Sequence, residues 1–471
     1  MKSRISIPLA ALSLLLLLNA CTVGPAYHRP TVALPERWEL SGEQAAAIAT
    51  PQWWEQFGDP ELNRLVTLAL QENRDIRKAA AAVEEYLALL GVQQSARYPQ
   101  VTASASASRQ KAQQSGDPLT PANPYSNNFN VSLNLSYELD LWGRISRLEE
   151  AARADLLARD EARRGVILSI ASQVAVSYIQ LLELDKRMAV ALDAMKAREE
   201  AYRLAEIRFA GGMISELDVQ QSAVELATAR ALVPDLERLQ QLREHQISVL
   251  TGHNPQRVTR GSSFDALVSP PLPAYLPSEL LRRRPDIMQA EQNLIAANAR
   301  IGTEMAGYFP RLSLTAMLGE TTDRLLPFNW NTTLLQAGVS ATAPIFNGFQ
   351  TTRLVEAAGA REQQARAAYE QTVMTSFREV YDALVSRRSY TMQAAAQAGQ
   401  VEALRKVLKL AQLRYVNGYT SYIDVLDARR SLLNAELEHI QSRSAACQQI
   451  IELYRALGGG WEVAGGRARL P

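Results

Sequence analysis

Cysteine is nearly absent from this chain of 471 residues, which holds only Cys21 and Cys447. Two cysteines cannot build the disulfide framework of a small exported domain, so the fold must depend on packing. An excess of charge of one sign is missing too, because 50 Lys and Arg residues are balanced by 49 Asp and Glu residues. The net charge of +1 offers no attraction to a polyanion, and we expect no nucleic-acid partner.

The motifs of common enzyme and metal sites are also absent. The four histidines, His28, His245, His253 and His439, are widely spaced and form no H-x-x-x-H pattern, and the cysteines form no C-x-x-C pattern. The sequence contains no G-x-S-x-G, P-loop or G-x-G-x-x-G motif. Cys447 has apolar neighbours on a predicted helix, which favours a small packed residue over a nucleophile. We therefore expect no enzyme, no catalytic residue, no cofactor and no metal site.

Long apolar runs are confined to the N-terminus. Lys2 and Arg4 precede the run "IPLAALSLLLLL", and "LNAC" ends at Cys21. This pattern resembles a signal peptide over 1–20 with a lipobox, so we expect Cys21 to be lipidated; a plain signal peptide with a chance cysteine is the alternative. No later segment has the ~20 uninterrupted apolar residues of a spanning helix, so any membrane crossing is expected as a β-barrel.

One pattern is written twice, at positions roughly 200 residues apart. The paired stretches are 75–101 with 286–312, 139–144 with 343–349, and 204–222 with 410–428. These matches indicate an ancient duplication. The expected organisation is a signal peptide (1–20), a lipidated N-terminal segment (21–57), repeat 1 (58–260), a Pro-rich linker (261–276), repeat 2 (277–460) and a C-terminal tail (461–471).

Each repeat is expected to follow the same order of elements. The order is a first helix (59–98 and 277–308), a strand (100–110 and 311–319), a turn-rich loop, a second strand (128–142 and 332–346), a very long helix (143–209 and 348–414) and a return helix (216–252 and 421–457). In "FNVSLNLSYELDLWG" (129–143) every second residue is apolar, so one face of that strand is apolar and the other polar. Each long helix has ~67 residues and would span on the order of 100 Å.

Four such strands cannot close into a membrane barrel, because small barrels begin at eight strands. Two chains would supply eight strands and three chains twelve. The long helices must form a matching cylinder that continues the lumen, which favours three. The residues thus predict a lipidated, exported, oligomeric channel, with a β part in a membrane and a helical extension of ~100 Å. A periplasmic coiled-coil scaffold lipoprotein is the alternative, and it leaves the strands unexplained.

Several motifs then resemble the outer-membrane factors of tripartite efflux pumps (the OprM/TolC type). They are "CTVGPAYHRP" (21–30), "WWEQFGDPELNRLVTLALQENRDIRKA" (53–79), "ELDLWGR" (138–144), "RRRPDI" (282–287) and "GYFPRLSL" (307–314). The resemblance covers almost the whole mature chain. It implies an α+β membrane protein: a homotrimeric 12-stranded outer-membrane β-barrel, four strands per chain, continued by a long helical coiled-coil barrel in the periplasm. It also implies outer-membrane lipid, a periplasmic adaptor and an inner-membrane pump of the resistance–nodulation–division class as partners, together exporting drugs or other small toxic compounds. Metal-ion efflux and type I secretion remain alternative uses of such a duct.

Two glycine turns end the long helices, in "RFAGGMISELDV" (208–219) and "RYVNGYTSYIDVLDARR" (414–430). Gly212 and Gly418 suit the left-handed position after a helix. Ser215 with Asp218, and Ser421 with Asp424, have the spacing of an N-cap followed by an acid in the first turn. Exposed hairpin tips are natural docking surfaces for an adaptor. The expected docking residues are Arg208, Gly212, Ser215, Asp218, Arg414, Gly418, Ser421 and Asp424.

Asp427 lies too far into its helix to act as a cap. By the resemblance, Ile423 and Asp427 match the constriction at the closed periplasmic mouth, which threefold symmetry would turn into rings. Arg430, one turn later, could hold the closed state through an ion pair. An ordinary solvated charge on a helix is the alternative interpretation of Asp427.

Overall fold

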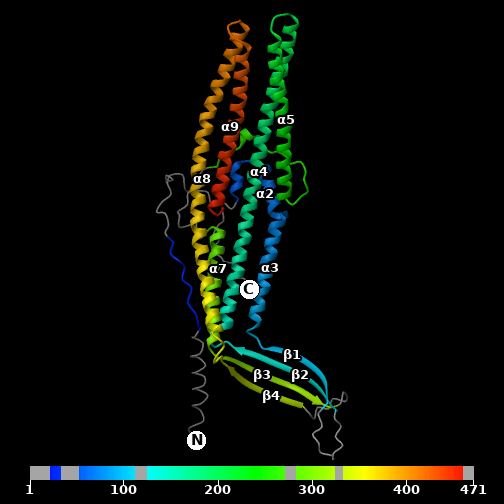
Figure 1. The fold of residues 1–471 in the computed structure, drawn as a ribbon, viewed down its shortest axis with the longest axis vertical. Coiled ribbons are helices and arrows are strands. Elements are labelled where there is room, and N and C mark those ends of the chain that lie inside the picture. The colour runs from blue at the N-terminus through cyan, green and yellow to red at the C-terminus, as the bar shows by residue number, and fades with distance from the viewer. Residues whose placement is uncertain (1–21, 33–51, 112–124, 271–282, 324–332, 460–471) are drawn as a thin grey trace, which may run out of the picture. The chain divides into compact units, whose positions relative to one another are not determined.

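The computed structural model describes residues 22–32, 52–111, 125–270, 283–323 and 333–459. Its elements are, in chain order, η3 (Trp53–Phe57), α2 (Pro60–Glu72), α3 (Arg74–Ser95), β1 (Gln100–Lys111), β2 (Tyr125–Leu139), α4 (Arg144–Ala210), α5 (Glu216–Leu250), η4 (Phe264–Ala266), α7 (Pro285–Met305), η5 (Ala306–Tyr308), β3 (Arg311–Thr322), β4 (Thr333–Thr342), α8 (Gln350–Val416) and α9 (Tyr422–Ala456). The described chain is thus mainly helical, with the four strands β1 to β4, and Figure 1 shows how these elements are arranged.

Residue contacts divide the chain into two compact units that differ from the expected repeats. Unit 1 comprises 1–31, 82–160 and 289–370, and unit 2 comprises 32–81, 161–288 and 371–471. Each unit takes residues from both halves of the sequence, and α4 and α8 contribute to both units. The division into repeats therefore stays a prediction about the origin of the chain.

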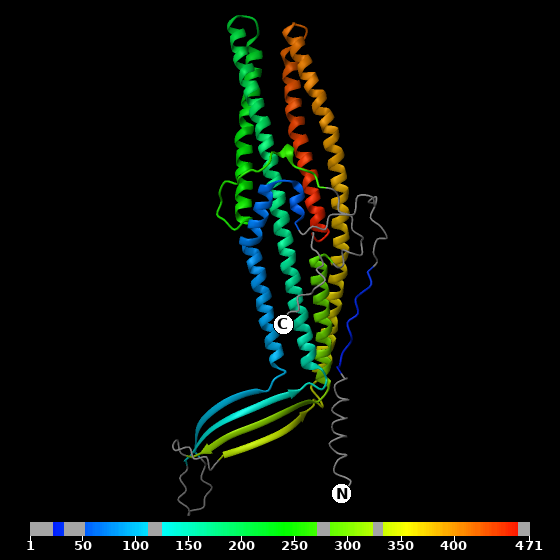
Figure 2. The ribbon, with the colours of Figure 1, turned by 180° about the vertical axis from the view of Figure 1, so that it is seen from behind.

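The four strands of unit 1 form one antiparallel sheet in the order β1-β2-β3-β4 (Figure 2). The register places Leu135 of β2 between Val101 of β1 and Ala316 of β3. Asn134, the preceding residue, lies between Thr102 and Met317. Since side chains alternate between faces, the register collects apolar residues on one face and mainly polar residues on the other. Strands β1 and β4 are the two edges of this sheet.

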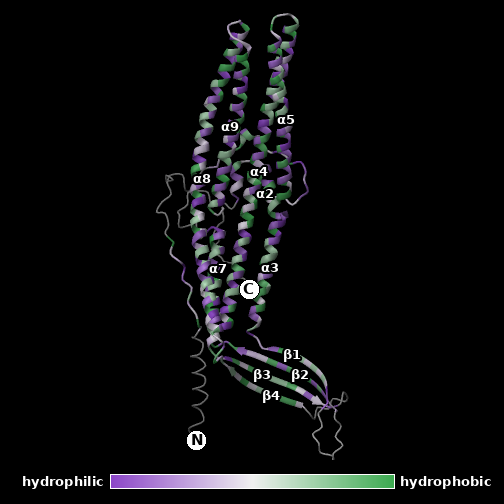
Figure 3. Cartoon of the chain, in the orientation of Figure 1, coloured by the Kyte–Doolittle hydropathy of each residue, from purple (hydrophilic) through white to green (hydrophobic). Residues whose placement is uncertain are grey.

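In the middle of β2 the exposure of the two faces is the reverse of that in a soluble sheet, while the edge strands β1 and β4 are exposed on both faces. On β2, Val131 and Leu133 are 45% and 49% exposed, while Ser132 between them is 4% exposed. Ser132 Oγ lies 2.9 Å from Ser104 Oγ, and Asn134 Nδ2 donates to both hydroxyls at 3.2 Å. The alternation of hydropathy along the strands can be followed in Figure 3. An apolar face turned outward is typical of strands that face lipid.

In both expected repeats, the second strand ends earlier than the sequence pattern indicated. Strand β2 ends at Leu139 rather than at 142, because Asp140 caps α4: its carboxylate accepts from the backbone N–H of Ile145 at 2.9 Å and of Ser146 at 2.8 Å. Strand β4 ends at Thr342 rather than at 346, since Pro344 has no N–H for a ladder. Apolar alternation continued past both ends and concealed them.

The first helix of repeat 1 is broken in two at Asn73. The backbone of Asn73 is extended (φ −61°, ψ 132°) and ends α2. Its amide Nδ2 donates to the carbonyl of Leu250 at 2.8 Å, and its Oδ1 accepts from the N–H groups of Asp75 and Ile76. The expected single helix over 59–98 is therefore wrong, because a long-range contact to the end of α5 stabilises the break.

Unit 2 contains the main hydrophobic core of the described chain. Fully buried side chains of η3 and α2 pack against one face of α4, where Val174, Tyr178 and Ile179 are 0% exposed. Helix α4 contains an 18-residue stretch that is long and apolar enough to cross a membrane. In the protein, however, 61% of that stretch is buried. Its hydrophobicity is explained by core packing.

Candidate functional site

Helices α4 and α5 form a first hairpin, and helices α8 and α9 form a second one; their tips are the turns at 211–215 and 417–421. The long helix of each hairpin ends in the same way. Gly212 and Gly418 have φ values of 70° and 75°, in the left-handed region. The N–H of Met213 donates to the carbonyl of Arg208, and the N–H of Tyr419 donates to that of Arg414, each at 2.8 Å. These are the six-to-one bonds of a Schellman motif, which only a left-handed residue allows without strain. The role expected for both glycines agrees with this geometry.

The return helices begin at the two expected serines. Ser215 and Asp218 form a complete capping box: the N–H of Asp218 donates to Ser215 Oγ at 3.3 Å, and the N–H of Ser215 donates to Asp218 Oδ2 at 3.1 Å. Ser421 accepts instead from the N–H of Ile423 at 3.4 Å. Asp424 accepts from the hydroxyl of Thr420. The two tips are therefore alike in backbone and different in side-chain chemistry.

A contact between the two hairpins was not foreseen from the sequence. The guanidinium of Arg208, at the end of α4, lies 5.7 Å from the ring centroid of Tyr415 at the end of α8. Its Nη1 also donates to the Tyr415 hydroxyl at 3.5 Å. Tyr415 in turn packs against Tyr422 of α9, with ring centroids 5.1 Å apart. The only signal of this contact in the sequence is that Arg208-Phe209 and Arg414-Tyr415 occupy equivalent positions at the ends of the two long helices.

The three expected gate residues lie together at the start of α9. Ile423 is 47% exposed. Asp427 and Arg430 form an i,i+3 ion pair, and their side chains are 58% and 60% exposed. At the equivalent positions of the first hairpin stand Leu217, Gln221 and Val224, which carry no charge. The exposed carboxylate of Asp427 thus has no counterpart at the equivalent position of the first hairpin, Gln221.

A buried arginine near these residues is a further element that sequence reasoning missed. Arg198 of α4 is 5% exposed and forms an ion pair with Glu225 of α5 at 3.1 Å. Burial lowers the pKa of Arg198; Glu225 opposes this effect, and the like charges of Arg429 and Arg430 on α9 add to it. Arg198 is therefore paired with α5 through Glu225 and lies within the electrostatic influence of Arg429 and Arg430 on α9.

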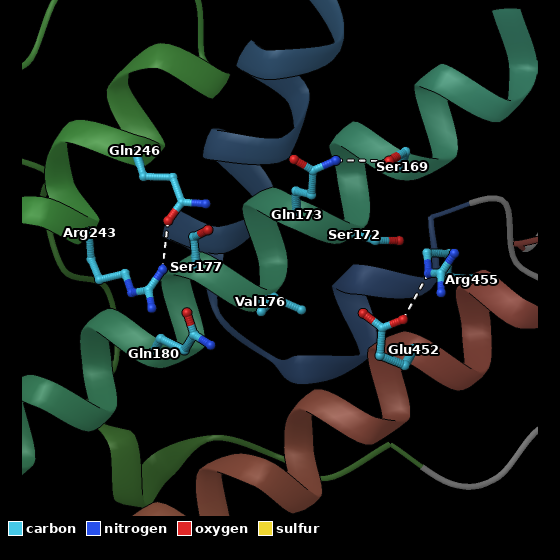
Figure 4. Close-up of a pocket in the computed structure, with 10 residues that line it drawn as sticks. All are labelled: Ser169, Ser172, Gln173, Val176, Ser177, Gln180, Arg243, Gln246, Glu452 and Arg455. Carbon is cyan, nitrogen blue, oxygen red and sulfur yellow. Dashed lines mark hydrogen bonds and ion pairs between the residues drawn. The ribbon is translucent and has the colours of Figure 1, made fainter. Parts of the chain in front are cut away.

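The face of α4 opposite the core is polar and borders a pocket of about 380 Å³ (Figure 4). The lining residues are Ser169, Ser172, Gln173, Val176, Ser177 and Gln180 of α4, Arg243 and Gln246 of α5, and Glu452 and Arg455 of α9. Ser172 is 2% exposed, and its hydroxyl has no hydrogen-bond partner among the described residues. Helix α4 thus carries an apolar face that packs in the core and a polar face that borders the pocket.

The lipidation candidate Cys21 lies outside the described residues. The segment that follows it is held at the junction of sheet and helix within unit 1. The N–H of Val23 donates to the Trp142 carbonyl at 3.1 Å, and Arg147 donates to the carbonyl of Gly24 at 3.4 Å. A side chain on Gly24 would approach the Cα of Gly302 to 2.5 Å. Among the described residues, no group of three or more His, Cys, Asp or Glu side chains could hold a metal ion.

Comparisons with known proteins agree with this geometry. A family model described as "Outer membrane efflux protein" matches residues 65–253 and 276–459. The solvent efflux pump outer membrane protein SrpC of Pseudomonas putida is 34% identical, over 98% of this chain and 99% of its own length. The cation efflux system protein CusC of Escherichia coli is 33% identical, over 95% and 97%.

The solved structure of the outer-membrane channel OprN matches with a TM-score of 0.85 and 33% identity, covering 94% of this chain and all of that one. The expected fold class and the resemblance to outer-membrane factors are therefore confirmed. The chain belongs to the outer membrane efflux protein family, and it is an outer-membrane exit channel of a tripartite efflux system.

Proposed function

We propose that three copies of this chain close their sheets into one 12-stranded barrel whose polar face lines the lumen. The observation that carries this proposal is the reversed exposure in the middle of β2, with Leu133 exposed and Ser132 buried, on a sheet whose register gathers apolar residues on one face. Its edges β1 and β4 each pair with one strand in the described sheet. Pairing β4 of one copy with β1 of the next would satisfy both edges and remove the exposed ladders.

The cargo we propose is a range of small organic toxic compounds, delivered by a periplasmic adaptor and an inner-membrane pump of the resistance–nodulation–division class. The relative SrpC, named for solvent efflux, supports this choice. No enzymatic step is needed for an exit duct, because the pump supplies the energy and selects the cargo. The polar face of α4 suits a water-filled passage that does not retain its solutes.

Lipidation of Cys21 would anchor the chain in the membrane. The bond from Val23 to Trp142 places the residues just after Cys21 at the base of the sheet. Trp142 stacks on Phe309 with ring centroids 4.7 Å apart. Aromatic rings at strand ends are typical of the membrane interface, so an acyl chain on Cys21 would lie close to lipid.

The tips carry two further proposed roles, gating and adaptor docking. The gate is assigned to Ile423, Asp427 and Arg430, with a ring of three carboxylates favouring cations at the mouth. Docking is assigned to the exposed hairpin turns with Arg208, Gly212, Ser215 and Asp218 on one tip, and Arg414, Gly418, Ser421 and Asp424 on the other.

The proposal is tested with the purified full-length protein in detergent and in lipid bilayers. We expect trimers by light scattering, a strand signal in circular dichroism that resists heat, and discrete conductance steps. Monomers without conductance would contradict the barrel and favour a periplasmic scaffold.

Export of metal cations is the second candidate, because CusC, named for cation efflux, is 33% identical. Deleting the gene and measuring growth with organic solvents and with metal salts separates the two. Sensitivity to solvents alone supports the first candidate, and sensitivity to metal salts alone supports the second.

A further inference from the structure

The segment between α5 and the described end at 270, here called the belt (residues 253–270), is fixed along its length in unit 2. In its first half, Arg260 donates to Asp185 of α4 through Nε at 2.9 Å and Nη2 at 3.1 Å. The same guanidinium pairs with Glu244 of α5. The belt is therefore attached to both helices of the first hairpin.

The middle of the belt is held by a buried carboxylate. Asp59, which is 0% exposed, accepts from the N–H of Ser262 at 2.8 Å and from the Tyr178 hydroxyl at 3.1 Å. The Tyr178 oxygen accepts from the N–H of Gly261 at 2.9 Å. A Cβ on Gly261 would lie 2.4 Å from Asp59 Oδ1, so no side chain fits here.

The far part of the belt joins helices from both halves of the sequence. Asp265 accepts from Lys186 Nζ of α4 through Oδ2 and from Arg443 Nη1 of α9 through Oδ1, each at 2.7 Å. The Arg443 guanidinium also lies 5.1 Å from the ring centroid of Phe264. Beyond this point, the N–H of Val268 donates to the carbonyl of Phe57 at 3.2 Å.

We propose that Asp265 is a positioning residue for the gate. Its carboxylate holds Arg443 of α9 beside Lys186 of α4, and so fixes the position of α9 at Arg443. The part of α9 that carries Asp427, here called the gate end, extends from this point. This inference rests on the proposed gate at Asp427. Arg443 follows Asp427 by 16 positions, which is about 24 Å of helix. The gate end of α9 can therefore move while the helix is retained at Arg443.

The two ion pairs of Asp265, with Lys186 and with Arg443, are here called the clasp. Such ion pairs are weak enough to break when the channel changes its conformation. The side chains of Asp265, Lys186 and Arg443 are 47%, 39% and 36% exposed. Ion pairs at such exposure are individually weak and screened by salt. Two of them share one carboxylate, so removing that charge breaks both ion pairs together, while the buried core still holds α9 against α4.

The test compares trimers of the wild type with those of Asp265→Asn, Asp265→Glu and Asp235→Asn. Asp235 pairs with Arg238 within α5 alone, at 2.7 Å, so its change alters charge without releasing another helix. Hydrogen exchange of the α9 amides over 422–443 is the primary measurement, and single-channel conductance is the second. All four proteins are first checked for trimer formation and helix content.

We expect exchange in α9 to become about three- to tenfold faster in Asp265→Asn, to stay near the wild-type rate in Asp265→Glu, and to remain unchanged in Asp235→Asn. Unchanged exchange in Asp265→Asn would overturn the clasp, whatever the conductance does. Faster exchange with a higher conductance supports the whole inference. Faster exchange with an unchanged conductance would uphold the clasp and overturn the gate assignment.

Discussion

The guanidinium of Arg208 lies over the ring of Tyr415, 5.7 Å from its centroid, although the two residues are 207 positions apart in the sequence. The contact connects the end of α4 to the end of α8, so it joins the tips of the two hairpins. Both residues are partly buried, and a cation–π contact of this kind contributes on the order of 1 kcal/mol. That is enough to bias a mouth that opens by separating its hairpins.

We expect Arg208→Ala to increase the open population of the isolated trimer by about two- to fivefold. The equivalent Arg414 has no side-chain hydrogen bond or ion pair within the described part of the chain. Arg414→Ala is therefore the matched control and should leave the conductance unchanged. Single-channel recordings in planar bilayers provide the measurement, and equal effects of both substitutions would contradict a specific role for the Arg208 contact.

Asp427→Ala should loosen the closed mouth. The substitution removes three carboxylates around the axis and releases Arg430 from its ion pair. We expect the conductance to rise on the order of twofold and the preference for cations to fall. Gln221→Ala changes the equivalent position of the first hairpin and should do neither. A wild-type conductance and selectivity in Asp427→Ala would show that this carboxylate is only a solvated surface charge.

Leu135→Arg and Asn134→Arg separate the two faces of the sheet. Leu135 lies between Val101 and Ala316 on the apolar face, so an arginine there should cost barrel assembly about 2–4 kcal/mol near the middle of the membrane. Asn134→Arg adds the same charge on the polar face and should assemble. Folding into lipid vesicles, followed by the shift of heat-resistant trimers on gels, measures both. Equal assembly of the two variants would mean that the faces are wrongly assigned.

Gly261→Ala should destabilise the protein through the belt. The new methyl group would collide with Asp59, which is buried and bonded on both carboxylate oxygens, at a cost of about 1–3 kcal/mol. Gly399 lies inside α8 with open space around it, so Gly399→Ala should instead stabilise the helix by up to about 1 kcal/mol. Thermal denaturation followed by circular dichroism should move in opposite directions for the two variants. A neutral Gly261→Ala would show that the belt can shift without loss.

The stability that Asp265 provides should depend on pH in the acid range only. The hydrogen bond from Lys186, with a further one from Arg443, lowers the pKa of Asp265 below its usual 3.8. A lowered pKa in the folded state means that the contribution is complete above pH 3.8 and is lost as the pH falls through the lowered value. The difference in denaturation midpoint between wild type and Asp265→Asn should therefore be constant from neutral pH down to about 5 and shrink in stronger acid. A difference that changes near neutral pH would implicate another group.

The sequence by itself determined the parts of this protein that depend on local periodicity and turn chemistry. Alternation of apolar residues predicted the faces of β2, because successive side chains of a strand point to opposite sides. The glycines at 212 and 418 and the serines at 215 and 421 marked the hairpin tips, since the left-handed turn and the N-cap are local requirements. The resemblance to outer-membrane factors then identified the family.

Only the tertiary structure decided the features that depend on distant partners. Asn73 breaks a helix because Leu250 accepts its amide, and Asp59 is buried because Tyr178 and Ser262 donate to it. The linker expected over 261–276 begins as part of the belt, which is held by Asp59 and by partners from α4, α5, α9 and η3. No periodicity encodes such contacts, since the free energy that stabilises them comes from groups far away in the chain. The local pattern therefore specified the elements, and long-range hydrogen bonds and ion pairs specified where they end and what they hold.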